Sequence, residues 1–236
     1  MRYRSRLVVA IAVSATVLVV AAVAGWRTMQ PPATDAAATS LERLDDYGVV
    51  PAFTLTERSG RMVTRDELAG LVWIADFIYT ECTETCPAQS LQFARLQHEF
   101  SQADRVRFVS VTVDPAHDTP DVLRRYAARY GATDRWWFLT GDKQEIYCLA
   151  QKGFRLSVVD PAAASPPSCG VAFPFGASRA WASHGSKGLI MHSARFVVID
   201  GRGHIRAYHL ATDPESVAKL PTNIRALVGE PGGHAR

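Results

Sequence analysis

Two cysteines stand where an apolar run of the sequence ends and a helix is expected to begin. Residues 71–79 are almost wholly apolar, and Cys82 and Cys86 follow closely behind them. Pro87 has no N–H to donate and fits the first turn of a helix, so it supports a helix start at this point. If the helix starts near Cys82, the separation of four residues stacks both thiols on one face. An exposed turn that carries two thiols suits either a soft metal ion or reversible disulfide chemistry.

The remaining pattern alternates between strands and helices. Residues 53–64 predict a hairpin with a glycine-containing turn, and residues 158–189 lack a regular pattern. The other strands are expected at 71–79, 106–113, 136–140, 194–200 and 204–210, and the helices at 88–100, after 118, at 143–153 and at 213–227. Such alternation, closed by a hairpin and a helix, indicates an α/β fold with a central mixed sheet and flanking helices.

The position of the thiol turn favours a thioredoxin-like fold, which carries its chemistry at the end of the first central strand. A flavodoxin-like sheet is the alternative. That fold normally holds a phosphate in a loop after its first strand, and the turn around Cys82 and Cys86 contains no glycine to build one. We therefore predict a thioredoxin-like domain that begins with a hairpin.

The N-terminus predicts export. Arg2, Arg4 and Arg6 precede an apolar run over 7–25, which is long enough to span a bilayer as one helix. The arginines predict a cytoplasmic N-terminus, while a signal peptide cleaved near 22–24 is the alternative. The expected divisions are a cytoplasmic tail and transmembrane anchor over 1–28, a linker rich in Pro, Ala and Thr over 29–45, the thioredoxin-like domain over 46–230 and a tail over 231–236.

Charge and cysteine content limit the classes of function. The net charge is +3, and no basic stripe with interleaved aromatic residues is present, which argues against nucleic acid as a partner. The chain has four cysteines, and exported proteins commonly pair theirs. Cys148 and Cys169 could form a structural bridge, or Cys148 could be a small buried apolar side chain. The sequence leaves these two interpretations open.

Four segments, in order, resemble the Sco/SenC family of membrane-anchored copper proteins. They lie within a similarity that extends over about 48–227, and they are residues 77–87 at the thiol turn, 111–120, 137–141 and 191–203. The resemblance implies a thioredoxin-like domain outside the cytoplasm, in the bacterial periplasm or the mitochondrial intermembrane space. It also implies that Cys82, Cys86 and His192 bind copper.

By this resemblance the protein is a metallochaperone or assembly factor rather than an enzyme. It would deliver copper, as Cu(I) or Cu(II), to a subunit of cytochrome c oxidase or prepare that copper centre, with a second copper chaperone as a further partner. Cu(I) is soft and prefers thiolate, while imidazole suits both oxidation states, so a Cys2His site fits this role. Thr83 and Glu84 depart from the family, whose loops often have proline and aspartate at these positions.

The alternative function is a membrane-anchored thiol–disulfide oxidoreductase that acts on cysteines of a copper-accepting partner. In that case Cys82 and Cys86 would be the catalytic residues. Three residues separate them, whereas thioredoxin-like enzymes usually have two, which argues against general dithiol catalysis. A peroxidase or a purely structural tether fits the thiol turn less well.

Other polar residues near these segments have structural explanations. We expect Asp118 or Thr119 to cap the helix that follows them. The alternative role for Asp114 and Asp118 is to order this loop near the metal; for Asp118 we favour capping, and we leave the role of Asp114 open. Glu81 is expected to be solvated, because copper would not choose a carboxylate over thiolate. His184 is interpreted as a solvated histidine in a loop.

Overall fold

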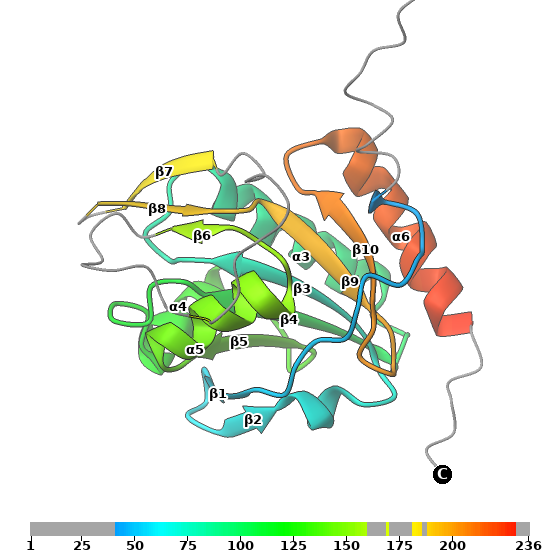
Figure 1. Ribbon diagram of the computed structural model, residues 1–236, viewed down its shortest axis with the longest axis horizontal. Coiled ribbons are helices and arrows are strands. Elements are labelled where there is room, and N and C mark those ends of the chain that lie inside the picture. The colour runs from blue at the N-terminus through cyan, green and yellow to red at the C-terminus, as the bar shows by residue number, and fades with distance from the viewer. Residues whose placement is uncertain (1–40, 160–168, 170–180, 186–187, 230–236) are drawn as a thin grey trace, which may run out of the picture. The chain divides into compact units, whose positions relative to one another are not determined.

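Figure 1 shows the computed structural model of the 236-residue chain. The structure describes residues 41–159, 169, 181–185 and 188–229, and for 159, 181–185 and 188–192 it describes the backbone alone. The chain from Leu41 onward groups as one compact unit. Its centre is a mixed sheet of seven strands in the order β10-β9-β3-β4-β5-β1-β2.

Parallel strands form the middle of this sheet, and antiparallel strands form its borders. β3, β4 and β5 run parallel, whereas β9 pairs antiparallel with β3 and β1 pairs antiparallel with β5. The strands are β1 Thr54–Glu57, β2 Met62–Thr64, β3 Val72–Ile78, β4 Val106–Thr112, β5 Trp136–Thr140, β9 Arg195–Ile199 and β10 Ile205–Leu210. The predicted α/β class with a mixed sheet and an N-terminal hairpin is confirmed, and the antiparallel borders argue against the flavodoxin-like alternative.

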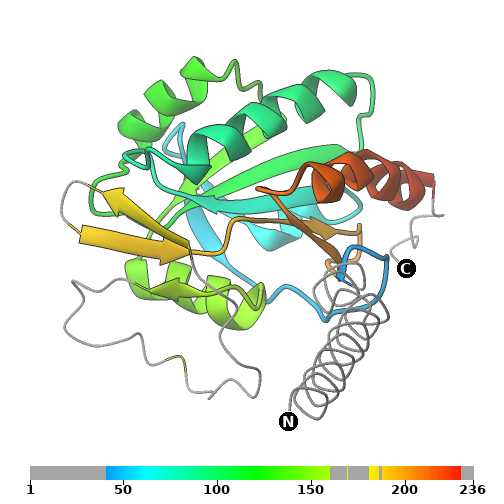
Figure 2. The same cartoon turned by 90° about the horizontal axis from the view of Figure 1, so that it is seen from above.

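Helices cover both faces of the sheet, as the view from above in Figure 2 shows. α3, α4 and α6 lie on one face, and α5 with the π-helical turn η2 lies on the other. The helices are the 3-10 turn η1 Arg65–Leu68, α3 Thr85–Glu99, α4 Pro120–Arg129, α5 Lys143–Cys148, η2 Leu149–Gly153 and α6 Pro214–Gly229. Phe93 of α3 stacks on Phe196 with 4.8 Å between ring centroids, and Phe154 packs against Phe77 at 5.3 Å. All residues of β3 are consequently buried, as its apolar sequence predicts.

A second, three-stranded sheet lies at the carboxyl end of β3 in both views. Its order is β6-β8-β7, with β6 at Val158–Val159, β7 at Trp181–Gly185 and β8 at Gly188–His192. The prediction that 158–189 is irregular is therefore wrong for the described parts of that segment. After Trp181, β7 consists of small and polar residues with weak strand propensity, so its pairing with β8 defines it rather than its own pattern.

The membrane anchor predicted over 1–28 lies outside the described residues, and so does the tail over 231–236. Within the part of the chain that the structure describes, no helix has both the length and the apolar character needed to cross a bilayer. Glu42, which falls in the predicted linker, is buried and pairs with Lys219 of α6 at 2.6 Å.

A buried polar network joins β10 to α6 and to the start of the described chain. The fully buried His209 ring donates from Nδ1 to the Ser216 carbonyl (2.8 Å), and its Nε2 lies 3.0 Å from Asn223 Nδ2. Asn223 Nδ2 also donates to the Glu42 carbonyl (2.7 Å), which fixes the amide orientation, so His209 Nε2 must accept. Burial lowers the pKa of His209, Lys219 adds to this effect, and Ser216 and Glu42 oppose it.

This network predicts a loss of stability in mild acid. Because the folded pKa of His209 lies below the ordinary value of about 6.5, the unfolded chain binds the proton first. The contribution of neutral His209 to the free energy of unfolding is complete above about pH 6.5. It is lost as the pH falls through the pKa that His209 has in the folded protein. Urea unfolding at about pH 7.5 and about pH 5.5 measures it. The His209→Gln variant should show a smaller difference between the two conditions than the parent, and an equal difference would contradict this account.

Candidate metal centre

The two thiols meet at the junction of β3 and α3. After β3 the chain turns, and Cys82 N–H donates to the Tyr79 carbonyl at 3.2 Å. α3 begins at Thr85, so the condition for stacking both thiols on one helix face, a helix start near Cys82, is not met. Cys86 is the second residue of α3, and its backbone N–H donates to Cys82 Sγ at 3.3 Å. A backbone N–H in the first turn of α3 therefore bonds to the Cys82 sulfur in the turn before it. The two thiols are not stacked along one face of a helix.

Both thiols are reduced and buried rather than exposed. Cys82 is 5% exposed and Cys86 is 0% exposed, so the expectation of an exposed thiol turn is wrong. Burial raises the pKa of the Cys86 thiol, a hydrogen bond with the Cys82 side chain raises it further, and the backbone of Tyr79 acts in the opposite direction. The raised pKa disfavours the thiolate form of Cys86.

An unexpected buried carboxyl group lies close enough to Cys86 to affect its pKa. Asp76 of β3 is completely buried, and burial raises its pKa to about 7. Neither of its oxygens makes a well-formed hydrogen bond to a described residue, although Ser110 on β4 lies close enough to lower the pKa in part. Its charge contributes to the raised pKa of Cys86. The sequence carried a signal for it, since Asp76 is the one acidic residue in the apolar run 71–79.

A second loop holds the thiol turn in place. Asp118, which is 0% exposed, accepts hydrogen bonds from the Thr80 N–H (3.0 Å), from the Thr80 hydroxyl and from the Thr112 hydroxyl. The cap of α4 is Thr119, whose hydroxyl accepts from Val122 N–H at 3.4 Å. The preferred assignment of Asp118 as that cap is therefore wrong. Asp118 instead connects the end of β4 to the residue that lies two positions before Cys82.

His117 extends this contact to the surface. Its Nδ1 lies 3.1 Å from Asp118 Oδ1, and its Nε2 lies 3.2 Å from Glu81 Oε1. The hydrogen bond with Asp118 is the main cause that raises the pKa of His117, and Glu81 contributes to the same shift. Glu81 is thus paired rather than simply solvated. Sequence reasoning missed His117, although it lies in the same loop as Asp114 and Asp118.

His192 lies on β8, the strand that leads into β9. β3 and β9 pair antiparallel, with Ala75 opposite Val197. This register places the start of β9, and the end of β8 just before it in the chain, towards the end of the sheet where β3 finishes and the thiol turn follows. His192 is the last residue of β8, and its side chain lies outside the described ones, as does that of His184. Among the side chains that are described, no three His, Cys, Asp or Glu residues form a group that could hold a metal.

The other two cysteines are joined. Cys148, the last residue of α5, forms a disulfide with Cys169. This decides between the two interpretations that the sequence left open, in favour of the structural bridge. Cys82 and Cys86 are not in a disulfide. The four cysteines thus comprise one disulfide and one pair of thiols, Cys82 and Cys86, which can react or bind a metal.

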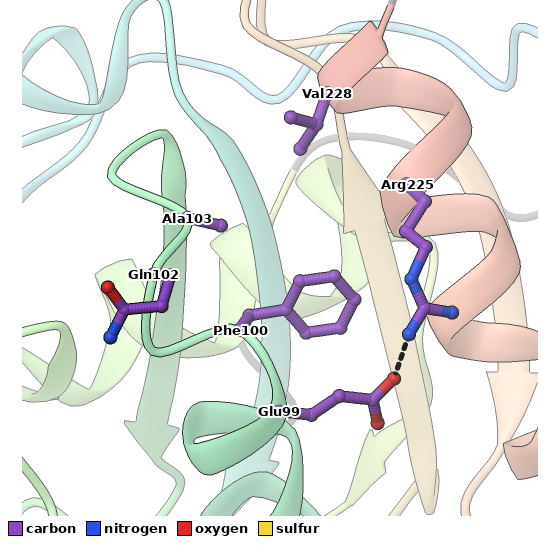
Figure 3. Close-up of a pocket in the computed structure, with 6 residues that line it drawn as sticks. All are labelled: Glu99, Phe100, Gln102, Ala103, Arg225 and Val228. Carbon is purple, nitrogen blue, oxygen red and sulfur yellow. Dashed lines mark hydrogen bonds and ion pairs between the residues drawn. The ribbon is translucent and has the colours of Figure 1, made fainter.

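A surface pocket lies far from these thiols. It has a volume of about 310 Å³, and Figure 3 shows its lining: Glu99, Phe100, Gln102, Ala103, Arg225 and Val228. The guanidinium of Arg225 pairs with Glu99 and lies 5.4 Å from the centre of the Phe100 ring. Glu99 is the last residue of α3 and Cys86 is the second, so about 20 Å of helix separates the pocket from the thiols. The pocket is therefore not part of the candidate metal centre.

Known proteins share this arrangement of elements. The Bacillus subtilis SCO1 protein homolog is 40% identical over 119 residues, which make up 49% of this chain and 61% of that relative. The chain thus spans about three-fifths of the length of that curated relative. BsSco, a member of the Sco family of cytochrome c oxidase assembly proteins in which a disulfide switch has been identified, is 26% identical with a TM-score of 0.60, over 80% of this chain and 98% of BsSco.

A further solved structure shares the fold, and a family model covers most of the chain. Bradyrhizobium japonicum ScoI, solved with copper bound, has a TM-score of 0.56 at 21% identity, over 74% of this chain and 99% of ScoI. The model of the SCO1/SenC family matches residues 42–228, which include the thiol turn, the Asp118 loop and β8. With this match and the B. subtilis relative, the chain belongs to the SCO1/SenC family.

Proposed function

We propose that this protein is a copper-binding assembly factor that delivers copper to, or prepares, the copper centre of cytochrome c oxidase. Cys82, Cys86 and His192 would hold the copper. The observation that carries the proposal is the pair of reduced thiols at the start of α3, with Cys86 N–H donating to Cys82 Sγ at 3.3 Å. The assembly role described for BsSco and the copper bound by ScoI support the assignment.

The chemistry of the thiol pair fits copper as cargo. Two sulfurs within hydrogen-bond reach of one another can both contact one soft ion, and Cu(I) prefers such ligands. The N-terminus of α3 favours the negative charge that the thiols acquire when they exchange protons for the metal. An imidazole as the third ligand would let the site keep copper in either oxidation state, and three ligands leave a position for a ligand from the acceptor.

The cellular setting is part of the same proposal. The apolar run over 7–25 would anchor the chain in a membrane with the folded domain outside the cytoplasm, in a bacterial periplasm. The partners would be a copper-accepting oxidase subunit and a second copper chaperone. The Cys148–Cys169 disulfide supports this location, because disulfides persist in oxidising compartments.

A thiol–disulfide oxidoreductase is the second candidate, because the same two thiols could reduce a partner. The spacing argues against it, because three residues separate the two cysteines whereas thioredoxin-like enzymes usually have two. In this alternative Cys82 and Cys86 act as catalytic residues and copper has no role.

Copper binding and disulfide turnover distinguish these functions. The full chain in detergent, reduced and equilibrated with Cu(I), should retain about one copper per chain against a competing chelator. It should reduce a model disulfide no faster than a free thiol does. Retention of no copper, together with rapid and repeated disulfide reduction, would overturn the proposal in favour of the oxidoreductase.

A further inference from the structure

The strand that ends at His192 depends on a very short neighbour. β6 has two residues, and it pairs with β8 in a register that sets Val158 opposite His192. Two hydrogen bonds continue the contact, from Ser193 N–H to the Ser157 carbonyl (3.0 Å) and from Ser157 N–H to Ser193 Oγ (3.1 Å). A strand of two residues is not stable alone, so its position must be maintained by the segments on either side.

The segment before β6 is attached to the main sheet. Gln151 of η2 donates from Nε2 to the Val158 carbonyl at 3.1 Å. α5, which leads into η2, is fixed by Tyr147, whose buried hydroxyl donates to the Val113 carbonyl beyond the end of β4 (3.0 Å). The start of β6 is thus tied to the core through α5 and η2.

The segment after β6 is tied back to the same helix by a covalent bond. Cys148 at the end of α5 is bonded to Cys169, which lies 21 positions further along the chain. β6 lies inside the loop that this bond closes. Closing a loop removes the open conformations that the segment would otherwise sample, so the bond limits how far β6 can move from α5.

We propose that the Cys148–Cys169 disulfide is a positioning element of the metal centre. It keeps β6 paired with β8 and thereby sets the backbone at His192. This inference rests on the proposed role of His192 as a copper ligand. Without the bridge, β6 separates from β8 more often. The His192 imidazole then leaves the copper, while the thiolates of Cys82 and Cys86 remain bound.

Amide hydrogen exchange tests the first half of the proposal without copper. The full chain and its Cys148→Ala/Cys169→Ala variant are compared with Cys82 and Cys86 reduced in both. We expect exchange at the Ser157 and Ser193 amides to be at least about tenfold faster in the variant, with β3 and β9 unchanged as internal controls. If the variant does not fold, the parent chain is compared before and after reduction of the Cys148–Cys169 bond in the folded protein, and the Ser157 and Ser193 amides should exchange faster after reduction. Unchanged exchange at these amides overturns the proposal.

Copper spectroscopy tests the second half. In the bridge variant loaded with Cu(II), the imidazole nitrogen signal in pulsed electron paramagnetic resonance should weaken, and copper should dissociate at least about tenfold faster. A variant that exchanges faster but keeps the parent nitrogen signal and dissociation rate overturns the positioning role. A His192→Ala variant that binds copper like the parent instead overturns the proposed ligand, and leaves the effect of the bridge on β6 and β8 standing.

Discussion

The Cys86→Ser variant should bind Cu(I) at least about a thousandfold more weakly than the parent chain. Serine has nearly the same size as cysteine, so it preserves the packing of the fully buried position. Its hydroxyl remains protonated at neutral pH, and oxygen is a poor ligand for a soft ion. Competition with a chromophoric Cu(I) chelator, at equal protein and copper concentrations, measures the change.

A substitution in the same loop provides the matched control. Thr83 lies between the two thiols, is exposed and carries no proposed role, so Thr83→Ser should keep the parent affinity. The midpoint of thermal unfolding of each variant separates loss of a ligand from loss of the fold. If Cys86→Ser, folded by this criterion, kept copper within about tenfold of the parent, the sulfur of Cys86 would not be a ligand.

The Asp118→Ala variant should lose on the order of 3–5 kcal/mol of unfolding free energy, although Asp118 is not a proposed ligand. The substitution leaves the Thr80 N–H and two hydroxyl groups, those of Thr80 and the fully buried Thr112, without their acceptor. Each unsatisfied buried donor costs about 1–3 kcal/mol. Urea unfolding near neutral pH, with the same slope for both proteins, gives the difference.

Another aspartate in the neighbouring helix serves as the control for this substitution. Asp121 lies on the surface of α4 and pairs with Arg124 at 2.6 Å in an exposed ion pair. Asp121→Ala should change the unfolding free energy by about 0.5 kcal/mol or less. If Asp118→Ala behaved like Asp121→Ala, the account of Asp118 as the connection between β4 and the thiol turn would be wrong.

The sequence was informative wherever local pattern decides structure. The apolar run 71–79 became the central strand β3, and the adjacent Pro87 indicated correctly that a helix starts close to the cysteines. The helix does not start at Cys82 itself, because a backbone hydrogen bond of Cys82 to Tyr79 keeps that residue in the turn. Element type thus follows from periodicity, while the exact end of an element depends on individual hydrogen bonds.

The role of Asp118 and the burial of the thiols depend on contacts between residues far apart in the sequence, so local sequence patterns did not reveal them. Asp118 was interpreted as a helix cap because its spacing from α4 allowed that role, yet its partner Thr80 is 38 positions away in the chain. Burial of the thiols and of Asp76 likewise depends on segments that no local window contains. The residues that would bind copper were identified by resemblance to a family, and their spacing alone would have left a structural disulfide between Cys82 and Cys86 as an alternative.

X-ray absorption at the copper edge tests the central claim most directly, because it counts the atoms bound to the metal. The full chain loaded with one equivalent of Cu(I) should show two sulfur neighbours and one imidazole nitrogen. The His192→Ala variant should keep both sulfurs and lose the imidazole. A parent spectrum with fewer than two sulfurs, or a His192→Ala spectrum that retains the imidazole, would contradict the proposed Cys82, Cys86 and His192 site.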